Sequence, residues 1–67
     1  MFPNLEAEIA RRKLTNAQCA KVCGITEKAF SNKRCGRTDF NLSEIKTLQK
    51  EFFRTCSLEY LFSEEVL

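Results

Sequence analysis

The four cysteines of this 67-residue chain are the first side chains whose chemistry needs an explanation. Cys19 and Cys23 lie one helical turn apart, and Cys35 and Cys56 follow at longer intervals. Cysteines in proteins bind metal ions, form disulfides or pack as small apolar side chains. Each of these uses implies a different kind of protein, and each needs a different spacing of the cysteines.

The spacing disfavours both a metal site and a disulfide. Structural zinc sites take four ligands, usually in two close pairs, whereas the intervals here are three, eleven and twenty residues. Side chains four apart on a helix have Cβ atoms about 5–6 Å apart, and a disulfide needs about 3.5–4.5 Å. We therefore expect no bound metal, and cysteines that pack as core residues in a reducing cytoplasm.

Other kinds of chemistry lack the residues they need. The chain has no histidine and only two glycines, so the usual general base and a glycine-rich phosphate loop are missing. No apolar run approaches 18 residues, and the first residues do not resemble a secretory signal. We expect a cytoplasmic protein that is not an enzyme, with no cofactor, no membrane association and no small-molecule substrate.

The charge is unevenly distributed along the chain. Residues 11–37 carry eight basic side chains and one acidic one, a net charge of +7, although the whole chain has only +2. The first ten residues carry −2, and residues 38–67 carry −3. A basic middle between acidic ends predicts an anionic partner on one face, and the alternative is a charged surface that only meets water.

A local pattern marks four helix starts. An apolar residue precedes a Thr, Asn or Ser, and a second apolar residue follows five positions after the first, as in a hydrophobic staple around an N-cap. The expected caps are Thr15, Thr26, Asn41 and Ser57, and Gln18 and Glu44 complete two capping boxes. With a first helix beginning near Asn4, the predicted helices span about 4–13, 15–23, 26–35, 41–53 and 57–62.

The helix ends and the inward faces agree with this assignment. Gly24 and Gly36 are placed to take the left-handed conformation that ends a helix, and no strand pattern competes. The residues expected to face inward are Leu5, Ile9, Cys19, Ala20, Cys23, Phe30, Ile45, Leu48, Phe52, Leu58, Leu61 and Phe62. The sequence predicts one compact all-α domain over residues 1–67, a five-helix bundle with a frayed tail at 63–67.

The second and third predicted helices are joined by a short turn at Cys23-Gly24-Ile25. The stretch LTNAQCAKVCGITEKAFSNKRCGRTDFNLSEI resembles the helix-turn-helix of the lambda-type phage repressor and Cro (XRE-like) family. The likeness covers residues 4–62, with the helix-turn-helix at about 15–35. Arg34 and Cys35 depart from the family, which commonly has an apolar residue and Asn there, so Arg34 is expected to snorkel or to reach a phosphate.

This resemblance implies a sequence-specific transcriptional regulator, a phage- or prophage-like repressor that binds double-stranded DNA. Its candidate base-reading residues, all on the third helix, are Glu27, Lys28, Ser31 and Asn32. Its candidate phosphate contacts are Asn16, Lys33, Arg37 and Thr38. The pairing chemistry is suitable, because Asn pairs with adenine, Lys with guanine and Glu with the cytosine amine.

The resemblance also implies a homodimer on a palindromic operator, because one recognition helix reads only a few base pairs. We expect the fourth and fifth helices and the tail to form the interface, with Phe53, Tyr60 and Leu67 as candidate contacts. A protein-interaction module, such as an antitoxin or an adaptor using the same helices, is the alternative function. A steep loss of affinity with salt would distinguish DNA binding from it.

Overall fold

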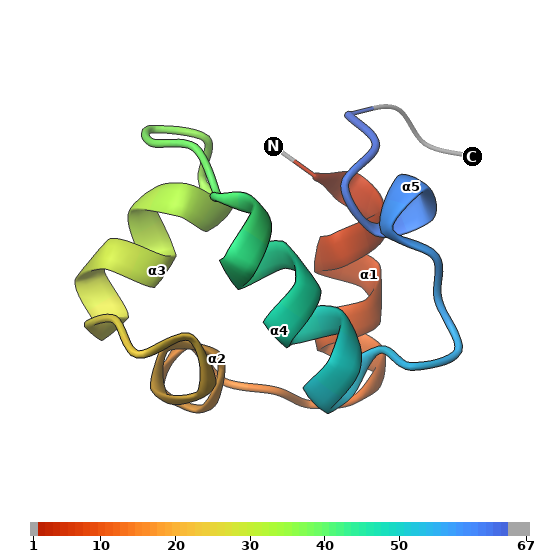
Figure 1. Ribbon diagram of the computed structural model, residues 1–67, viewed down its shortest axis with the longest axis horizontal. Helices are drawn as coiled ribbons and strands as arrows, with labels where there is room; N and C mark the ends of the chain where they lie inside the picture. Colours follow the sequence, from red (N-terminus) through yellow and green to blue (C-terminus); the bar gives the residue numbers. More distant parts are fainter. Residues whose placement is uncertain (1, 65–67) are drawn as a thin grey trace.

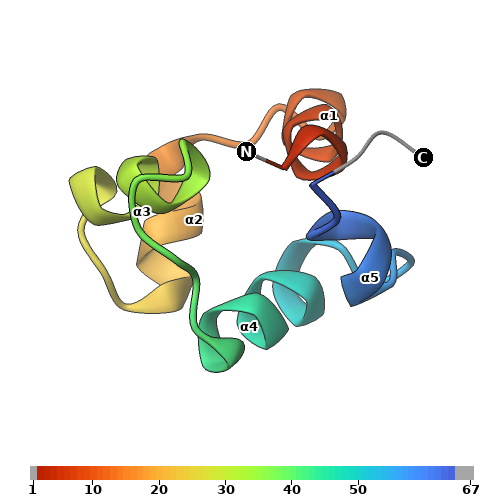
Figure 2. The same ribbon diagram turned by 90° about the horizontal axis from the view of Figure 1, so that it is seen from above.

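Five helices make up an all-α fold in the computed structural model, which describes residues 2–64. They are α1 (Pro3–Arg11), α2 (Asn16–Cys23), α3 (Glu27–Arg34), α4 (Leu42–Phe52) and α5 (Leu58–Leu61). In the compact globule of 29 × 23 × 22 Å, α2 packs on α3 and α4, while α5 packs on α1 and α4 (Figures 1 and 2). Residues 2–64 contain no strand, and the predicted all-α fold of five helices is confirmed.

Four of the helices begin at the predicted caps. A side-chain oxygen at each cap accepts a hydrogen bond from the backbone N–H three residues later, at Thr15, Thr26, Asn41 and Ser57. Gln18 and Glu44 complete the two predicted capping boxes. α1 begins with Pro3 in its first turn and has no side-chain cap, which suits a residue without a backbone N–H.

Three helices end with the same left-handed motif, but only two of them use glycine. Gly24 and Gly36 take φ values of 72° and 85°, as predicted. At the end of α1, Lys13 holds this position with φ 54°, and the next N–H, of Leu14, donates to the Ile9 carbonyl at 3.0 Å. α1 therefore ends at Arg11, two residues earlier than predicted.

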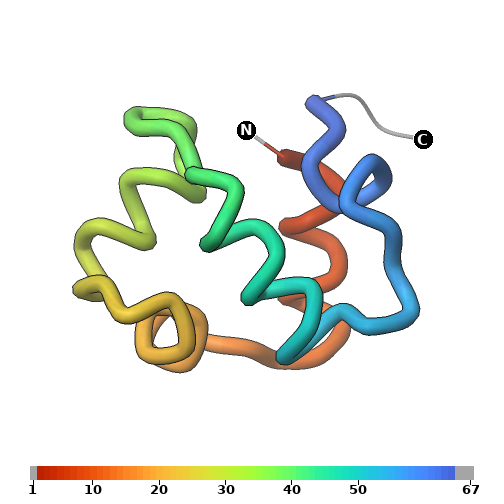
Figure 3. The backbone as a smooth tube through the Cα atoms, in the orientation of Figure 1, coloured from red at the N-terminus to blue at the C-terminus, as the bar shows by residue number. Residues whose placement is uncertain are grey.

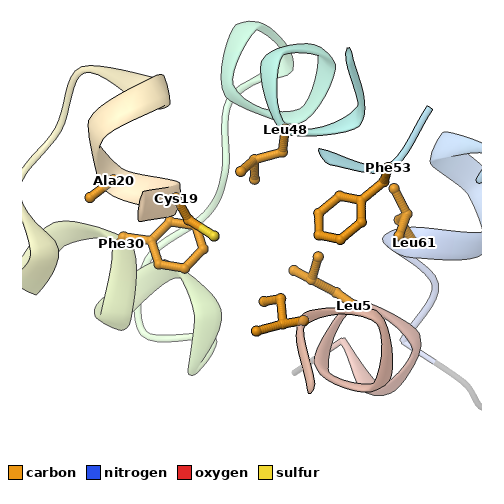
Figure 4. Close-up of a cluster of buried hydrophobic side chains, with 8 residues drawn as sticks. Leu5, Cys19, Ala20, Phe30, Leu48, Phe53 and Leu61 are labelled. Carbon is orange, nitrogen blue, oxygen red and sulfur yellow. The ribbon is translucent and has the colours of Figure 1, made fainter. Parts of the chain in front are cut away.

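The buried apolar side chains come from all five helices and from the residue after α4 (Figure 4). They are Leu5, Ile9, Cys19, Ala20, Phe30, Leu48, Phe53 and Leu61. Phe53 rather than Phe52 is fully buried, because α4 ends at Phe52 and the backbone of Phe53 leaves the helical conformation. Phe53 had been a candidate for a dimer contact, and this prediction is wrong because its exposed fraction is 0%.

A cluster of aromatic rings joins the two ends of the described chain to the segment between α3 and α4. The ring centroids of Phe2 and Phe40 are 5.8 Å apart, and Phe62 lies 5.4 Å from each of them. Phe40 also lies 5.8 Å from Phe30 in the core. The backbone trace accordingly brings the start of α1 beside the end of α5 (Figure 3).

Candidate nucleic-acid interface

The candidate interface is formed by α2, α3 and the residues that follow α3. Only Gly24–Thr26 separate α2 from α3, and in Figure 1 α2 is seen end-on while α3 lies across the view. The two helices pack together, and each contributes a buried residue to the core: Phe30 of α3 is fully buried and Ala20 of α2 is 2% exposed. A small side chain such as Ala20 allows two helices to approach closely. The opposite side of α3 is thereby left facing solvent.

The predicted base-reading residues differ in their exposure. Glu27 and Lys28, in the first turn of α3, are exposed, and neither forms an ion pair within residues 2–64. Ser31 and Asn32, one turn further on, are half-buried. Thus the first turn of α3 presents its charged groups fully to solvent, and the second turn presents polar groups only in part. That these residues read bases stays a prediction.

Two of the predicted phosphate contacts follow α3 directly. Arg37 and Thr38 are exposed, and their backbone N–H groups donate to the Asn32 carbonyl at 2.8 and 3.4 Å. Gly36 makes this closure possible, because its φ of 85° suits a residue without a side chain. The closure holds the Arg37 backbone against the end of α3, while its guanidinium forms no ion pair in the described part of the chain.

Lys33, a third predicted phosphate contact, is engaged inside the fold. Its Nζ donates to both carboxylate oxygens of Glu44, at 2.6 and 2.5 Å, and so links α3 to α4. Burial acts to raise the pKa of Glu44, but the hydrogen bonds from Lys33 and from the Asn41 N–H together outweigh it and leave the pKa below 4.5. In this arrangement the Lys33 ammonium stabilises a buried carboxylate, and its contact with a phosphate stays a prediction.

Arg34 was expected to snorkel or to reach a phosphate, and in the structure its guanidinium instead bonds to side chains of α1 and α2. Its Nε and Nη2 donate to the two carboxylate oxygens of Glu6 at 2.5 and 2.8 Å, and its Nη1 donates to Oδ1 of Asn16 at 2.8 Å. These bonds connect the last residue of α3 to α1 and to the first residue of α2. The departure from the family pattern at position 34 was the sequence signal for an unusual contact, but nothing in it identified Glu6.

A third acidic side chain, Glu8, holds the end of α1 to α5. It is 2% exposed and accepts hydrogen bonds from Arg11 at 2.6 Å, from Arg12, and from the Tyr60 hydroxyl at 2.9 Å. The Arg12 hydrogen bond, followed by that of Tyr60, lowers the pKa of Glu8 below 4.5. Tyr60, another candidate dimer contact, thus has its hydroxyl engaged within the chain, and the third candidate, Leu67, lies outside the described residues.

Four of the eight basic side chains in residues 11–37, here called the basic block, form ion pairs with acids that lie outside this stretch. Arg11, Arg12, Lys33 and Arg34 form ion pairs with Glu6, Glu8 and Glu44. Four exposed cations of the block have no ion pair in the chain between residues 2 and 64: Lys13, Lys21, Lys28 and Arg37. The charge available to an anionic partner is therefore smaller than the sequence count indicates.

The cysteines occupy different environments, and all four are free. Cys19 is fully buried in the core, as predicted, and Cys23 is half-buried. Burial, with a smaller contribution from Cys23, raises the pKa of the Cys19 thiol to about 11. Cys35 is exposed at the end of α3. Cys19 therefore behaves as a small hydrophobic residue, whereas Cys35 meets solvent.

Residues 2–64 show no further feature that points to a different kind of site. They contain no cluster of three or more potential metal ligands and no pocket. None of their helices has the length and apolar character needed to cross a membrane. Comparison with known proteins gave no match to a family model, to a curated protein or to a solved structure.

Proposed function

We propose that the chain is a helix-turn-helix protein of the lambda repressor and Cro type. It binds double-stranded DNA sequence-specifically as a regulator of transcription. The observation that carries this proposal is the exposed first turn of α3, where Glu27 and Lys28 have no ion-pair partner in residues 2–64. A helix whose apolar side is anchored by a buried Phe30 can present the other side to a major groove without losing core contacts.

Base reading and phosphate binding are assigned to different parts of this surface. Lys28 and Asn32 carry groups that pair with base edges, Lys with guanine acceptors and Asn with both groups of adenine. Glu27 accepts from a cytosine amine, and Ser31 donates or accepts. Arg37 and Thr38 lie beyond the end of α3, where they meet phosphates rather than base edges.

Two copies on a two-fold axis would read two half-sites about 34 Å apart, which gives the specificity that one short helix lacks. We place the dimer contact on the outer surface of α4 and α5, away from α3. Phe53 takes no part in it, because its side chain is buried. The expected result is a palindromic site bound by two chains, which mass measurement of the complex tests. One chain bound to a single half-site would contradict the dimer.

The decisive experiment begins with selection of bound sites from a random DNA pool. The wild-type chain and three variants are then titrated with the selected and a scrambled duplex at several salt concentrations. Asn32→Ala should lose roughly 1–3 kcal/mol on the selected site only, because it removes a base contact. Arg37→Ala should weaken both duplexes and lower the salt slope by about one per site.

Arg54→Ala is the matched control, since Arg54 is an exposed cation between α4 and α5 without an ion pair in the described chain. It removes one positive charge and should leave both affinities nearly unchanged. If Asn32→Ala weakens both duplexes equally, α3 does not read sequence through that residue. If no duplex is enriched and binding is flat in salt, a protein-interaction module such as an antitoxin or an adaptor replaces this proposal.

A further inference from the structure

Arg34 is placed to control the orientation of a second side chain. Two of its nitrogens take both oxygens of the Glu6 carboxylate, which fixes the plane of the guanidinium. The third nitrogen, Nη1, then points at Asn16, 2.8 Å from its Oδ1. The Arg34 and Glu6 side chains are 24% and 31% exposed, so the pair is partly shielded from water. The guanidinium is thereby a fixed donor facing the start of α2.

The chemistry of the guanidinium decides which way the Asn16 amide turns. Arginine carries only donors, so the Asn16 atom facing Nη1 has to be the carbonyl oxygen. The amide nitrogen, Nδ2, then lies on the other side of the group and makes no hydrogen bond within residues 2–64. No fully buried side-chain nitrogen or oxygen in residues 2–64 lacks a partner, so Nδ2 is at least partly exposed to solvent. Arg34 therefore leaves Asn16 with an outward donor.

An outward donor at this position suits an anion. Asn16 is the first residue of α2, a helix with no acidic side chain in its first turn, so the positive end of the helix dipole is not compensated there. With the opposite amide orientation, a carbonyl oxygen would face the same anion and repel it. The amide orientation thus decides whether Asn16 attracts or repels a phosphate.

We propose that Arg34 is a positioning residue for DNA binding: it holds the Asn16 amide so that Nδ2 donates to a backbone phosphate. This inference rests on the proposed function, because the phosphate belongs to the bound duplex. Arg34 itself does not touch the DNA. Arg34 acts on DNA binding through its hydrogen bond to Asn16. Its effect therefore depends on which of the two side chains donates, and not only on how strongly α3 is held to α1.

A charge exchange separates positioning from a merely structural link. In the double variant Glu6→Arg, Arg34→Glu, the ion pair between α1 and α3 forms again, and the net charge is unchanged. The side chain at position 34 is then an acceptor, so Asn16 turns its NH2 group inward and presents Oδ1 outward. The exchange should restore thermal stability to near that of the wild type while DNA binding stays weak.

The experiment compares four proteins: wild type, Asn16→Ala, the charge exchange, and the charge exchange with Asn16→Ala. Thermal unfolding is measured for each, together with titration of the selected duplex. In the wild type, Asn16→Ala should weaken binding about tenfold, the loss of one hydrogen bond to a charged group. In the charge-exchanged background the same substitution should weaken binding less than twofold or improve it. Equal effects in both backgrounds would overturn the inference.

A second measurement does not depend on the exchanged protein folding. In wild-type protein labelled with nitrogen-15, the Asn16 side-chain NH2 resonances, identified by their loss in Asn16→Ala, should shift when the selected duplex is added. Unchanged resonances in a saturated complex would show that Nδ2 meets no phosphate. If the wild type binds no duplex at all, the proposed function fails. If it binds with a steep salt dependence and Asn16 is silent, only the positioning role fails.

Discussion

Glu8 in α1 accepts hydrogen bonds from Arg11, Arg12 and Tyr60, whereas Glu27 and Lys28 in α3 have no ion-pair partner in residues 2–64. Charged side chains in the α1–α5 region thus hold elements of the fold together. Those in the first turn of α3 lie exposed and make no such link. The surface open to a partner is therefore found from the unpaired charges and not from the charge count.

The two regions nevertheless share one core. Phe30 fills the side formed by α2 and α3, Phe53 fills the side formed by α1 and α5, and Leu48 of α4 lies toward both in Figure 4. A chain of this size buries little apolar surface, so neither region is expected to fold without the other. The two regions therefore differ in how their charged side chains are paired, but they are expected to fold and unfold together.

Removing a large side chain from this shared core should cause the greatest loss of stability. Phe30→Ala and Phe53→Ala should each destabilise the domain by about 3–5 kcal/mol, because both rings are fully buried and leave cavities. Such a loss is comparable with the whole stability expected of a small domain, so both variants should be largely unfolded by circular dichroism.

Leu42→Ala is the matched control, since Leu42 is 61% exposed and its loss should change the free energy of unfolding by less than about 0.5 kcal/mol. Two separate thermal transitions in either Phe variant would show that the halves fold independently, contrary to the shared core.

Acid should act on the two buried carboxylates that accept hydrogen bonds from basic side chains, Glu8 and Glu44. The pKa values of Glu8 and Glu44 lie below 4.5, so both carboxylates stabilise the fold above that pH. Their contribution is lost as the pH falls from about 4.5 through the lowered values, because in that range the unfolded state binds protons that the folded state does not. We expect stability, measured by urea unfolding, to fall steeply in that range.

Glu8→Gln and Glu44→Gln should each lower stability at neutral pH and flatten its fall in acid. Glu59→Gln serves as the control, because Glu59 is exposed and has no ion pair among the described residues. An acid profile that is unchanged in Glu8→Gln would contradict a stabilising role for its three hydrogen bonds.

The cysteines should show a smaller contrast. Cys19→Val should cost less than about 1.5 kcal/mol, because the volume is nearly conserved in an apolar site. A maleimide reagent should modify exposed Cys35 in the native protein and leave Cys19 unmodified, since burial excludes the reagent and keeps the thiol protonated, with a pKa of about 11. Modification of Cys19 as fast as Cys35, or stoichiometric bound zinc, would contradict the core assignment.

The helix starts were predictable because each depends on neighbouring residues. The side chains of Thr15 and Asn41 accept hydrogen bonds from backbone N–H groups only three residues away, so both capping boxes can be recognised from the local sequence. Gly24 and Gly36 are local signals in the same way. The exposure of Lys28 followed from the position of Phe30 on the same helix. Interactions between residues close in sequence are therefore enough to predict the helices and part of the candidate interface.

Contacts between distant residues were not predictable in this way. Glu6 and Arg34 are 28 residues apart, and nothing near either residue identifies the other as its partner. The engagement of Lys33 by Glu44 depends on how α3 packs beside α4. The burial of Phe53 instead of Phe52 depends on a helix ending one residue earlier than predicted. The candidate site thus differs from the one predicted from the sequence wherever a side chain is engaged by a residue distant in sequence.

A substitution at Lys13, between α1 and α2, should change the free energy of unfolding least. Lys13 ends α1 with φ 54°, a conformation that costs a residue with a side chain about 1–2 kcal/mol. Glycine avoids that strain but loses about 0.5–1 kcal/mol of chain entropy on folding. Lys13→Gly should therefore stabilise the domain by about 0.5–1 kcal/mol in urea unfolding. Lys13→Ala, which removes the charge but keeps the strain, should bring no such gain.

Gly24→Ala is the converse at the end of α2. A Cβ at Gly24 would meet nothing within 4 Å, so the substitution tests the φ of 72° without any steric clash. It should destabilise the domain by about as much as Lys13→Gly stabilises it. Gly24 precedes α3 and Lys13 precedes α2. The two substitutions therefore measure the cost of the same left-handed helix end at two places in the fold. If Lys13→Gly destabilises the domain, the Lys13 side chain has a stabilising contact that outweighs its strained backbone.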